Sequence, residues 1–296
     1  MGKNNYCVFI LTGGRPNYVL TIKTLKKSGY TGKIFLVVDD EDKTLNKYKE
    51  NFNNVLVFNK NTISKTFDTF DNFKNTNTVV YARNYCFHIA KKLGYKYFIQ
   101  LDDDYIAFEY RTIKGDKLAV ESVKNLDQIF NSMINFVSNT PTTSLALAQG
   151  GDFIGGAENG FAIKGGLKRK VMNSFVCSTD KPFNFLGKIN EDVTTYVYLG
   201  SVGYLFFTTH LASLVQKQTQ KTKEGMTTVY LNYGTYVKSF YSVLCSPSSV
   251  KIKVLNAKHK RIHHSIKWIN AVPKILSERH KKYDASCKPQ TQNKFF

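Results

Sequence analysis

The sequence predicts an α/β fold, with a mostly parallel central sheet flanked by helices and an irregular basic C-terminal part. Through about the first hundred residues, apolar segments of strand length alternate with segments of helical periodicity. Two of the expected strands run directly into acidic side chains, at Asp39-Asp40 and at Asp102 to Asp104. Parallel strands place their carboxyl ends at one edge of a sheet, and such folds bind ligands there. We therefore expect both acidic clusters to lie at the ligand-binding edge.

The first part of the chain is expected to contain buried strands joined by helices. The strands are "YCVFILT", "KIFLVV", "NVLVF" and "YFIQL". Val19, Ile22 and Leu25 recur at helical spacing, and Gly29 can end that helix. A weaker helix follows the second strand. A further helix before the last strand is indicated by apolar residues spaced four apart, Tyr81, Tyr85, Ile89 and Leu93.

The later part of the chain is less regular. We expect a helix near Val120 to Phe136 and then the glycine-rich stretch "QGGDFIGGAENGFAIKGG". The segment Thr194 to Val215 contains no Asp, Glu, Lys or Arg and could be taken for a membrane span. Its threonines and serines suit hydrocarbon poorly. We therefore expect Gly200 and Gly203 to divide it into a helix and a short aromatic strand.

Composition indicates a folded protein with an anionic partner. The chain has 296 residues, 42% of them hydrophobic, and a formal net charge of +20. Such an excess favours nucleic acid, an acidic membrane face or a phosphorylated small molecule as partner, although a basic surface without a partner is the alternative. The five cysteines are dispersed without a C-x-x-C pair, which is typical of reduced thiols in a cytoplasmic protein. The start "MGKNNYCVFILTGG" is expected to form a first strand and not a signal peptide.

Three adjacent aspartates at a strand end require an explanation, because their charges repel one another. Such carboxylates either bind a hard divalent cation or cap backbone amides in a loop. Mg²⁺ and Mn²⁺ prefer oxygen ligands and would bridge a diphosphate, neutralising the charge that grows on it as it leaves. Asp102 and Asp104 have the spacing of the D-x-D motif of sugar-nucleotide transferases. The phosphate-loop, dinucleotide-binding, zincin and α/β-hydrolase motifs are absent from the sequence.

The context of the aspartates resembles the glycosyltransferase A (GT-A) fold. The order "ARN" and then "GYKYFIQLDDD" is similar to the helix and metal motif of that fold. The resemblance implies that Arg83-Asn84 approach the diphosphate of the donor and that Asp39-Asp40 contact its nucleoside. Alternatively, Arg83 only pairs with a carboxylate and Asp39-Asp40 only cap a helix. The remaining donor-binding candidates are Thr12, Gly13, Arg15, Asp102 and Asp103.

An acidic pair, Glu191-Asp192, directly precedes an expected helix in "INEDVTTYVYLG". It resembles the motif that supplies the catalytic base in inverting enzymes of the GT-A fold, where the second acid has that role. The resemblance implies that Asp192 takes a proton from the acceptor hydroxyl. An ordinary acidic pair at a helix N-terminus is the alternative.

The last third of the sequence is strongly basic. From Leu205 to Lys282 there are 14 Lys and Arg residues and two acidic ones. Basic side chains interleaved with aromatic ones suit a phosphate backbone with unstacked bases nearby. Pro273 is expected to open a last helix. The DNA-binding candidates are Lys238, Lys251, Lys258, Lys260, Arg261 and Lys267.

Two late phrases make the resemblance more specific. "GTYVKSFYSVLCSPSSVKI" and "RIHHSIKWINAVPKILSE" are similar to phage members of the TET/JBP-associated glycosyltransferases, a resemblance that covers most of the chain. It implies a GT-A enzyme of the host cytoplasm that transfers a sugar from a nucleotide sugar, such as a UDP-sugar, to a 5-hydroxymethylpyrimidine in DNA. It also implies Mn²⁺ or Mg²⁺ as cofactor, and His263 or His264 as a further metal ligand.

Within a single GT-A domain, residues 1–105 would form the half that binds the nucleotide sugar and residues 106–296 the half that binds the acceptor. Two other functions remain open. One is a GT-A enzyme that acts on a polysaccharide or a protein, and the other is a non-catalytic DNA-binding protein of the same fold. The sugar, the pyrimidine, the stereochemical course and the oligomeric state are left open by the sequence.

Overall fold

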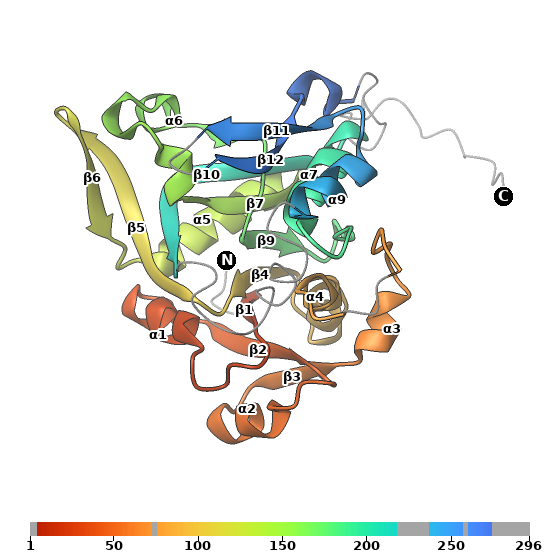
Figure 1. Cartoon of the computed structure of the whole chain (residues 1–296). Helices are drawn as coiled ribbons and strands as arrows, with labels where there is room; N and C mark the ends of the chain where they lie inside the picture. Colours follow the sequence, from red (N-terminus) through yellow and green to blue (C-terminus); the bar gives the residue numbers. More distant parts are fainter. Residues whose placement is uncertain (1–4, 73–75, 218–236, 257–259, 274–296) are drawn as a thin grey trace, which may run out of the picture.

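A ten-stranded mixed sheet forms the centre of the molecule (Figure 1). The computed structural model describes residues 5–72, 76–217, 237–256 and 260–273. The strand order is β3-β2-β1-β4-β9-β7-β10-β5-β6, with β8 beside β10. The strands are β1 (Tyr6–Leu11), β2 (Lys33–Asp39), β3 (Val55–Phe58), β4 (Tyr97–Asp102), β5 (Tyr105–Lys114), β6 (Lys117–Ser122), β7 (Thr142–Gln149), β8 (Leu167–Lys168), β9 (Ser174–Ser178) and β10 (Leu205–Gln216).

Most strands of this sheet run in one direction. The pairs β3–β2, β2–β1, β1–β4 and β7–β10 are parallel, while β9 lies antiparallel between β4 and β7. Strands β1, β4, β7 and β10 therefore end at the same edge of the sheet. We call it the carboxyl edge, and the three aspartates follow β4 there.

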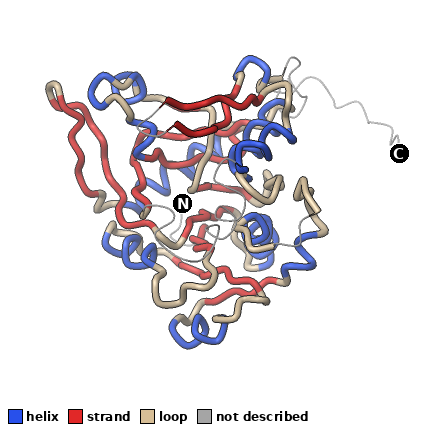
Figure 2. The backbone as a smooth tube through the Cα atoms, in the orientation of Figure 1, coloured by secondary structure: helices blue, strands red, loops and turns tan. Residues whose placement is uncertain are grey.

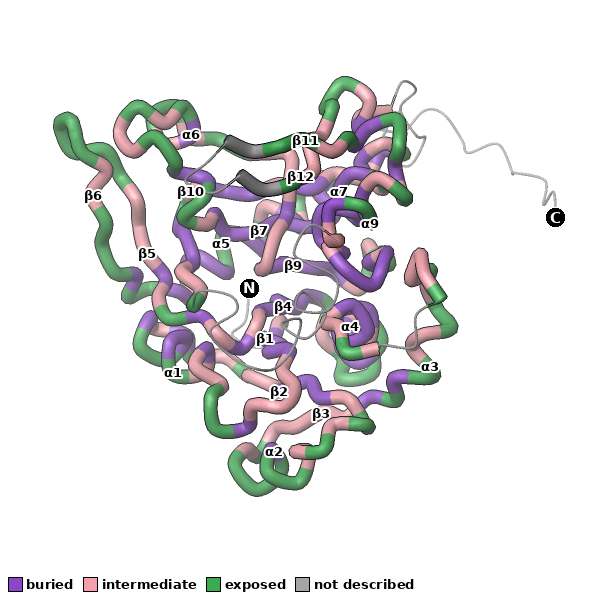
Figure 3. Tube along the Cα trace, viewed as in Figure 1, coloured by how far each residue is buried: buried purple, intermediate pink, exposed green. Residues whose placement is uncertain are grey.

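Helices cover both faces of the sheet (Figure 2). The helices of the described chain are α1 (Leu20–Lys27), α2 (Leu45–Asn51), α3 (Lys60–Ser64), α4 (Val80–Lys92), α5 (Leu126–Asn139), α6 (Gly160–Lys164), α7 (Glu191–Ser201) and α9 (Val237–Cys245). Alternate residues of β1 enter two different apolar clusters, because side chains alternate between the faces of a strand. Phe9 belongs to a cluster that includes residues of α4 and α7, whereas Ile10 belongs to a cluster that includes residues of α1 and α5. Figure 3 shows the resulting buried centre, with α2 and the tip of the β5–β6 hairpin exposed.

The predicted α/β class and the elements of the first hundred residues are confirmed. The four expected strands are β1 to β4, and the two marked helices are α1 and α4. Gly29 follows α1 with φ +86°. A Cβ atom there would lie 2.1 Å from the carbonyl oxygen of Lys124, so the close approach of the two backbones also requires glycine.

The predicted helix near Val120 to Phe136 is wrong in its first part. Val120 lies in β6 and is 50% exposed, and the helix α5 begins only at Leu126. The buried residues of α5 recur at helical spacing from Leu126 onward, whereas β6 pairs antiparallel with β5 as one arm of the β5–β6 hairpin. This hairpin was not predicted, because the sequence of β6, KLAVES, lacks the two-residue alternation of apolar and polar residues that marks a strand.

The charge-free segment is divided as predicted. Helix α7 ends at Ser201, and strand β10 begins at Leu205. The strand is longer than expected, since it runs to Gln216 and pairs with β7, β5 and β8. None of the helices that the structure describes combines the length and the apolar character that crossing a lipid bilayer demands.

A smaller unit packs against α7 on the C-terminal side of the chain. Its hairpin consists of β11 (Val250–Asn256) and β12 (Lys260–Ile266), and α9 packs on both strands. Trp268, in the short helix that follows β12, stacks on Tyr196 of α7 with the ring planes 9° apart. We call α9, β11 and β12 the C-terminal unit. The helix predicted to begin at Pro273 lies outside the described residues.

Candidate active site

The turn that contains the three aspartates is held in place by one threonine of α1. The Thr21 hydroxyl donates to the carbonyl oxygen of Asp102 at 2.6 Å and accepts from the Tyr105 amide at 3.0 Å. The Thr21 amide donates to the carbonyl oxygen of Asp103 at 3.1 Å. The N-terminal turn of α1 thus fixes the backbone on both sides of the aspartates. Thr21 was not singled out from the sequence, because its partners lie about 80 residues away.

Asp103, the middle aspartate, points into the protein. Its side chain is 1% exposed and accepts hydrogen bonds from Thr12 Oγ1 at 2.6 Å and Arg15 Nη2 at 2.8 Å. Burial raises the pKa of Asp103 to about 6, although Arg15 and Thr12 act to lower it. The structure therefore brings together three of the predicted donor-site residues, Thr12, Arg15 and Asp103.

Tyr48, which was not predicted from the sequence, stabilises the turn after β1, which contains Thr12 and Arg15. Its hydroxyl lies 2.8 Å from Thr12 Oγ1 and accepts from the Arg15 amide at 2.9 Å. Gly13 lies between these residues, and the next residue, Gly14, donates its amide to Asp42 at 2.7 Å. These contacts give the turn after β1 a defined shape beside the aspartates.

Asp102 and Asp104 flank the buried aspartate and are both partly exposed. Asp104 Oδ1 accepts from Gln216 Nε2 at 2.9 Å, which ties it to the end of β10. Burial raises the pKa of Asp102 to about 6, against the opposing effect of Arg83, and Asp104 and Glu191 raise it further. Burial also raises the pKa of Asp104. Crowded, partly desolvated carboxylate oxygens of this kind fit a hard divalent cation, which would relieve their repulsion.

Arg83 of α4 lies at the centre of a buried ion-pair network. Its side chain is 2% exposed and donates to Asp102 Oδ1 at 3.0 Å and Glu191 Oε1 at 2.8 Å. The guanidinium also lies over the Phe175 ring, 4.7 Å from its centroid. Burial by itself lowers the pKa of Arg83, but Asp102 and Glu191 more than reverse that effect. Arg83 thus connects the aspartate turn to the start of α7.

Asn84, the neighbour of Arg83, is engaged with the backbone of Phe185. Its Nδ2 donates to the Phe185 carbonyl at 3.0 Å, and its Oδ1 accepts from the Phe185 amide at 2.8 Å. Both ends of the buried amide are therefore used within the protein. The sequence predicted that Arg83 and Asn84 lie near the donor diphosphate, and the structure gives both of them protein partners.

The acidic pair at the start of α7 is turned in two directions. Glu191 pairs with Arg83, whereas Asp192 Oδ1 accepts from the adjacent Val193 amide at 2.7 Å. Burial raises the pKa of Asp192 to about 7, and the neighbouring Glu191 charge raises it in the same direction. A carboxylate with a pKa of this size is suited to accepting a proton near neutral pH.

The second acidic cluster, at the end of β2, makes contacts with α3. Asp40 accepts from the Lys60 amide at 3.0 Å and from Asn59 Nδ2 at 2.5 Å. Asp39 forms an ion pair with Lys60 Nζ at 3.1 Å. Asp40 thus caps the first turn of α3, which is the alternative that the sequence left open for it. The side chain of Asp39 remains 18% exposed.

The predicted histidines are not brought together with the aspartates. His263 and His264 lie on β12, and within the described part of the chain no three His, Cys, Asp or Glu side chains are grouped to hold a metal ion. Burial lowers the pKa of His264 to about 4, and His263 and Lys238 lower it further. Among the described residues, Asp102 and Asp104 therefore remain the candidates for holding a cation at this edge.

The basic residues of the C-terminal unit can be placed in part. Lys251 and Lys253 are two apart on β11 and exposed, so they share one face of the hairpin. The opposite face packs inward through Val250 and Ile266. Lys267 is exposed at the end of β12, and Lys238 lies on α9. Lys258 lies outside the described residues, and for Lys260 and Arg261 only the backbone is described.

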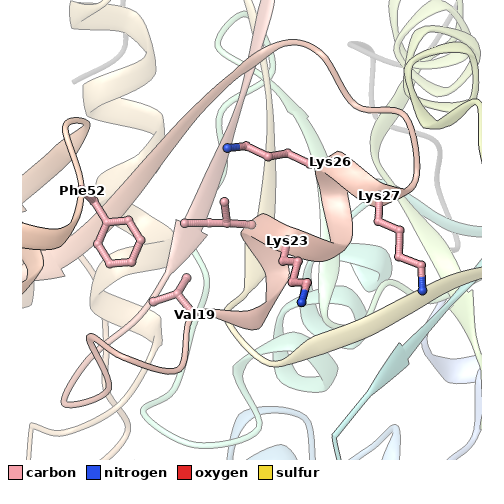
Figure 4. A pocket seen from close by; sticks show the side chains of 6 residues that line it. Val19, Lys23, Lys26, Lys27 and Phe52 are labelled. Carbon is pink, nitrogen blue, oxygen red and sulfur yellow. The ribbon is translucent and has the colours of Figure 1, made fainter.

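A surface depression of about 480 Å³ lies on the outer side of α1 (Figure 4). Val19, Ile22 and Phe52 give it an apolar lining, and three lysines of α1 border it. It contains none of the predicted site residues. We therefore place the candidate active site at the carboxyl edge, where the carboxylates are, and not in this depression.

Loss of Arg83 is expected to destabilise the protein strongly. Arg83→Met should lower the free energy of unfolding by about 3–5 kcal/mol, because it leaves Asp102 and Glu191 facing one another without a cation. Urea denaturation at pH 7.5 measures the change. Lys96→Met is the control, since the Lys96–Asp180 pair is exposed at both ends and its loss should have no measurable effect. Equal stability of the two variants would contradict the proposed importance of the network.

An α/β fold with a D-x-D pair at its carboxyl edge and an acidic pair at the start of a nearby helix is the arrangement expected of a sugar-nucleotide transferase. The comparison with protein families specifies which kind. The chain belongs to the TET-Associated Glycosyltransferase family, whose model matches residues 6–226. The mostly parallel central sheet and its flanking helices form the α/β arrangement that the sequence predicts.

Comparison with solved structures gives only distant similarity. Glucosyl-3-phosphoglycerate synthase from Mycobacterium tuberculosis, in complex with Mg²⁺ and UDP, is 9% identical with a TM-score of 0.42, over 89% of this chain and 88% of that one. The same enzyme with Mn²⁺, UDP and phosphoglyceric acid is 8% identical with a TM-score of 0.42, over 89% and 87% of the two chains. Similarity at this level carries no information on substrate. A search of curated proteins found no match.

Proposed function

We propose that this protein transfers a sugar from a nucleotide sugar, a UDP-sugar, to the hydroxymethyl group of a 5-hydroxymethylpyrimidine in DNA, with Mn²⁺ or Mg²⁺ as cofactor. The observation that carries the proposal is the arrangement at the carboxyl edge. Asp102 and Asp104 lie on either side of the buried Asp103. Arg83 forms ion pairs with Asp102 and Glu191, and the neighbouring Asp192 has a raised pKa. Family membership supports sugar transfer, and the +20 charge supports a polyanionic acceptor.

Asp102 and Asp104 would hold the divalent cation. When bound, the cation neutralises the charge that develops on the departing diphosphate. The turn after β1, with Thr12, Gly13 and Arg15, would border the donor because Asp103 fixes it beside the two outer aspartates. Asp39 would contact the nucleoside at the end of the neighbouring strand. Arg83 would act on the donor only indirectly, by orienting Asp102, since its guanidinium is buried among protein groups.

The reaction then needs one proton acceptor on the protein. The acceptor hydroxyl oxygen forms a bond to the anomeric carbon of the sugar while the bond from that carbon to the diphosphate oxygen breaks. Asp192 takes the hydroxyl proton, and the electron pair of the broken bond leaves with the nucleoside diphosphate. Direct displacement of this kind inverts the anomeric configuration. Glu191 is less suited to the task because its carboxylate neutralises Arg83.

The DNA is proposed to contact the C-terminal unit. Lys251 and Lys253 present two positive charges on the outer face of β11, Lys238 lies in the same unit, and Lys267 directly follows β12. Phosphate contacts of this kind hold a duplex without reading its sequence. A pyrimidine stacked inside a duplex would have to be extruded before its hydroxymethyl group could reach Asp192.

Affinity for DNA is expected to fall steeply with salt. Each Lys or Arg that contacts a phosphate should add about 0.9 to the slope of log affinity against log salt. The double variant Lys251→Gln/Lys253→Gln should therefore reduce the slope by about 2 and weaken binding to all sequences alike. Fluorescence anisotropy with a labelled duplex measures both.

Lys91→Gln/Lys92→Gln is the matched control for that measurement. These exposed lysines end α4, which leads into the start of β4, so they lie at the edge of the sheet opposite the aspartates. Their loss should leave the slope unchanged. A salt-independent affinity of the unmodified protein, or equal effects of the two double variants, would contradict a DNA-binding C-terminal unit.

One incubation separates the proposed function from the alternatives. The protein is mixed with Mn²⁺, labelled sugar nucleotides and duplex DNA that contains 5-hydroxymethylcytosine or 5-hydroxymethyluracil, and the digested nucleosides are identified by mass spectrometry. A glycosylated nucleoside supports the proposal. If sugar is transferred to a polysaccharide or a protein and not to DNA, the protein is a glycosyltransferase with a different acceptor. DNA binding without transfer or donor hydrolysis would indicate a non-catalytic protein.

A further inference from the structure

Asn190, the residue directly before the acidic pair, has an unusual conformation. Its φ of 60° and ψ of 33° lie in the left-handed region, which residues other than glycine seldom adopt. Asparagine tolerates this region better than most residues, but it is still unfavourable. Such conformations persist where the surrounding structure enforces them, and they are frequent at functional sites.

The side chain of Asn190 does not do what an asparagine at a helix N-terminus usually does. An N-cap asparagine normally accepts a hydrogen bond from an amide in the first turn of its own helix. Here the side chain makes no such bond to α7. Its Nδ2 instead donates to the hydroxyl of Ser242 on α9, at 2.6 Å. Ser242 is 1% exposed, and its hydroxyl also lies 3.4 Å from Thr194 Oγ1 on α7.

This hydrogen bond links the start of α7, which carries the proposed base, to the unit that is proposed to hold the DNA. Asn190 is followed by Glu191 and Asp192, the acidic pair of α7. Ser242 belongs to the C-terminal unit, which bears the lysines proposed to hold DNA. The left-handed turn at Asn190 sets the direction in which α7 begins, and the bond to Ser242 fixes that turn relative to the unit.

We propose that Asn190 is a positioning residue, which through its hydrogen bond to Ser242 sets the distance of Asp192 from an acceptor held by the C-terminal unit. The inference rests on the proposed function. Asn190 contacts neither the donor nor the acceptor in this scheme. It acts through Asp192, and a small displacement of a catalytic group can lower a rate by up to about a hundredfold.

Two substitutions separate the backbone conformation from the contact. Asn190→Gly keeps the left-handed turn accessible and removes the hydrogen bond, while Ser242→Ala removes the bond and leaves Asn190 in place. Both variants should lower kcat by about tenfold to a hundredfold. The KM for the sugar nucleotide and the affinity for DNA should stay within about twofold of the unmodified protein. Ser201→Ala is the control, because that hydroxyl bonds only to the Tyr198 carbonyl of its own helix among the described residues.

Combination with Asp192→Asn tests whether Asn190 acts through the base. If it does, Ser242→Ala should cause no further loss of kcat once Asp192 is replaced, since no base is left to position. A residue with only a structural role would lower the remaining rate again. Thermal unfolding confirms that each variant is folded under the assay conditions.

The outcomes distinguish this inference from the proposed function. Normal kcat in both folded variants, a loss of DNA affinity in place of kcat, or an additive loss in the Asp192→Asn background would overturn the positioning role while transfer to DNA stands. Absence of transfer by the unmodified protein would instead overturn the proposed function, and the inference with it.

Discussion

Replacement of Asp192 by asparagine is expected to lower the rate of sugar transfer by about 10²–10⁴-fold while the protein still binds the nucleotide sugar and DNA. The amide has nearly the same shape as the carboxylate but cannot take the proton of the acceptor hydroxyl. Single-turnover assays with labelled donor measure the rate, and titration with UDP and with duplex DNA measures binding. Asp180→Asn is the control, because Asp180 is exposed and pairs only with exposed Lys96 among the described residues.

Glu191→Gln should behave differently from Asp192→Asn, although the two residues are adjacent. It breaks the ion pair with Arg83, so it should lower the stability of the protein as well as the rate. A near-normal rate for Asp192→Asn would remove Asp192 from the mechanism. A product of retained anomeric configuration would argue against any base at this place.

The pH dependence follows from the same carboxylate. Asp192 must be ionised to accept a proton, and burial raises its pKa to about 7. Below that value the protonated form dominates, so kcat/KM should fall as the pH is lowered from 8 to 6. A nearby cation would move this fall to lower pH, because it favours the carboxylate. The Asp192→Asn variant should lose the dependence.

Removal of divalent metal is expected to reduce transfer at least about a hundredfold, since a bound cation supplies several kcal/mol of charge stabilisation. Mn²⁺ or Mg²⁺ should restore the activity that EDTA abolishes. Asp104→Asn should weaken binding of UDP in the presence of Mn²⁺ on the order of a hundredfold and have little effect on binding without metal. Isothermal titration calorimetry with and without Mn²⁺ measures this difference.

Asp116→Asn is the matched control for Asp104→Asn. Asp116 is exposed between β5 and β6 and should contribute nothing to UDP binding. Full transfer in the presence of chelator, or metal-dependent UDP binding that survives Asp104→Asn, would exclude Asp104 as a ligand.

Much of the fold could be predicted because its signals are local. The strands of the first hundred residues are short apolar runs, and α1 and α4 repeat their apolar residues at helical spacing. The β5–β6 hairpin escaped prediction because Val120 and its neighbours are mostly exposed, so no hydrophobic alternation marks them. The start of α5 was misplaced for the same reason.

The place of the acidic residues in the fold was predictable from the sequence, but their contacts were not. The spacing of the aspartates and their place after β4 indicated the carboxyl edge. The inward direction of Asp103 depends on Thr12 and Arg15, and the burial of Arg83 depends on Glu191, which lies 108 residues away. Tyr48, Gln216 and Thr21 bear no local motif, so only the folded chain could show their roles.

The hydrogen bonds of Thr21 to the aspartate turn affect the free energy with which a cation would bind there. Thr21 fixes the backbone of the turn, and Arg83 and Gln216 hold the side chains of Asp102 and Asp104. The two proposed ligands would therefore lose little conformational entropy on binding a cation. The free energy of binding is then determined mainly by stripping water from the ion and from the oxygens. Discrimination between cations would follow from how readily each gives up its hydration shell, which favours the softer shell of Mn²⁺ over that of Mg²⁺.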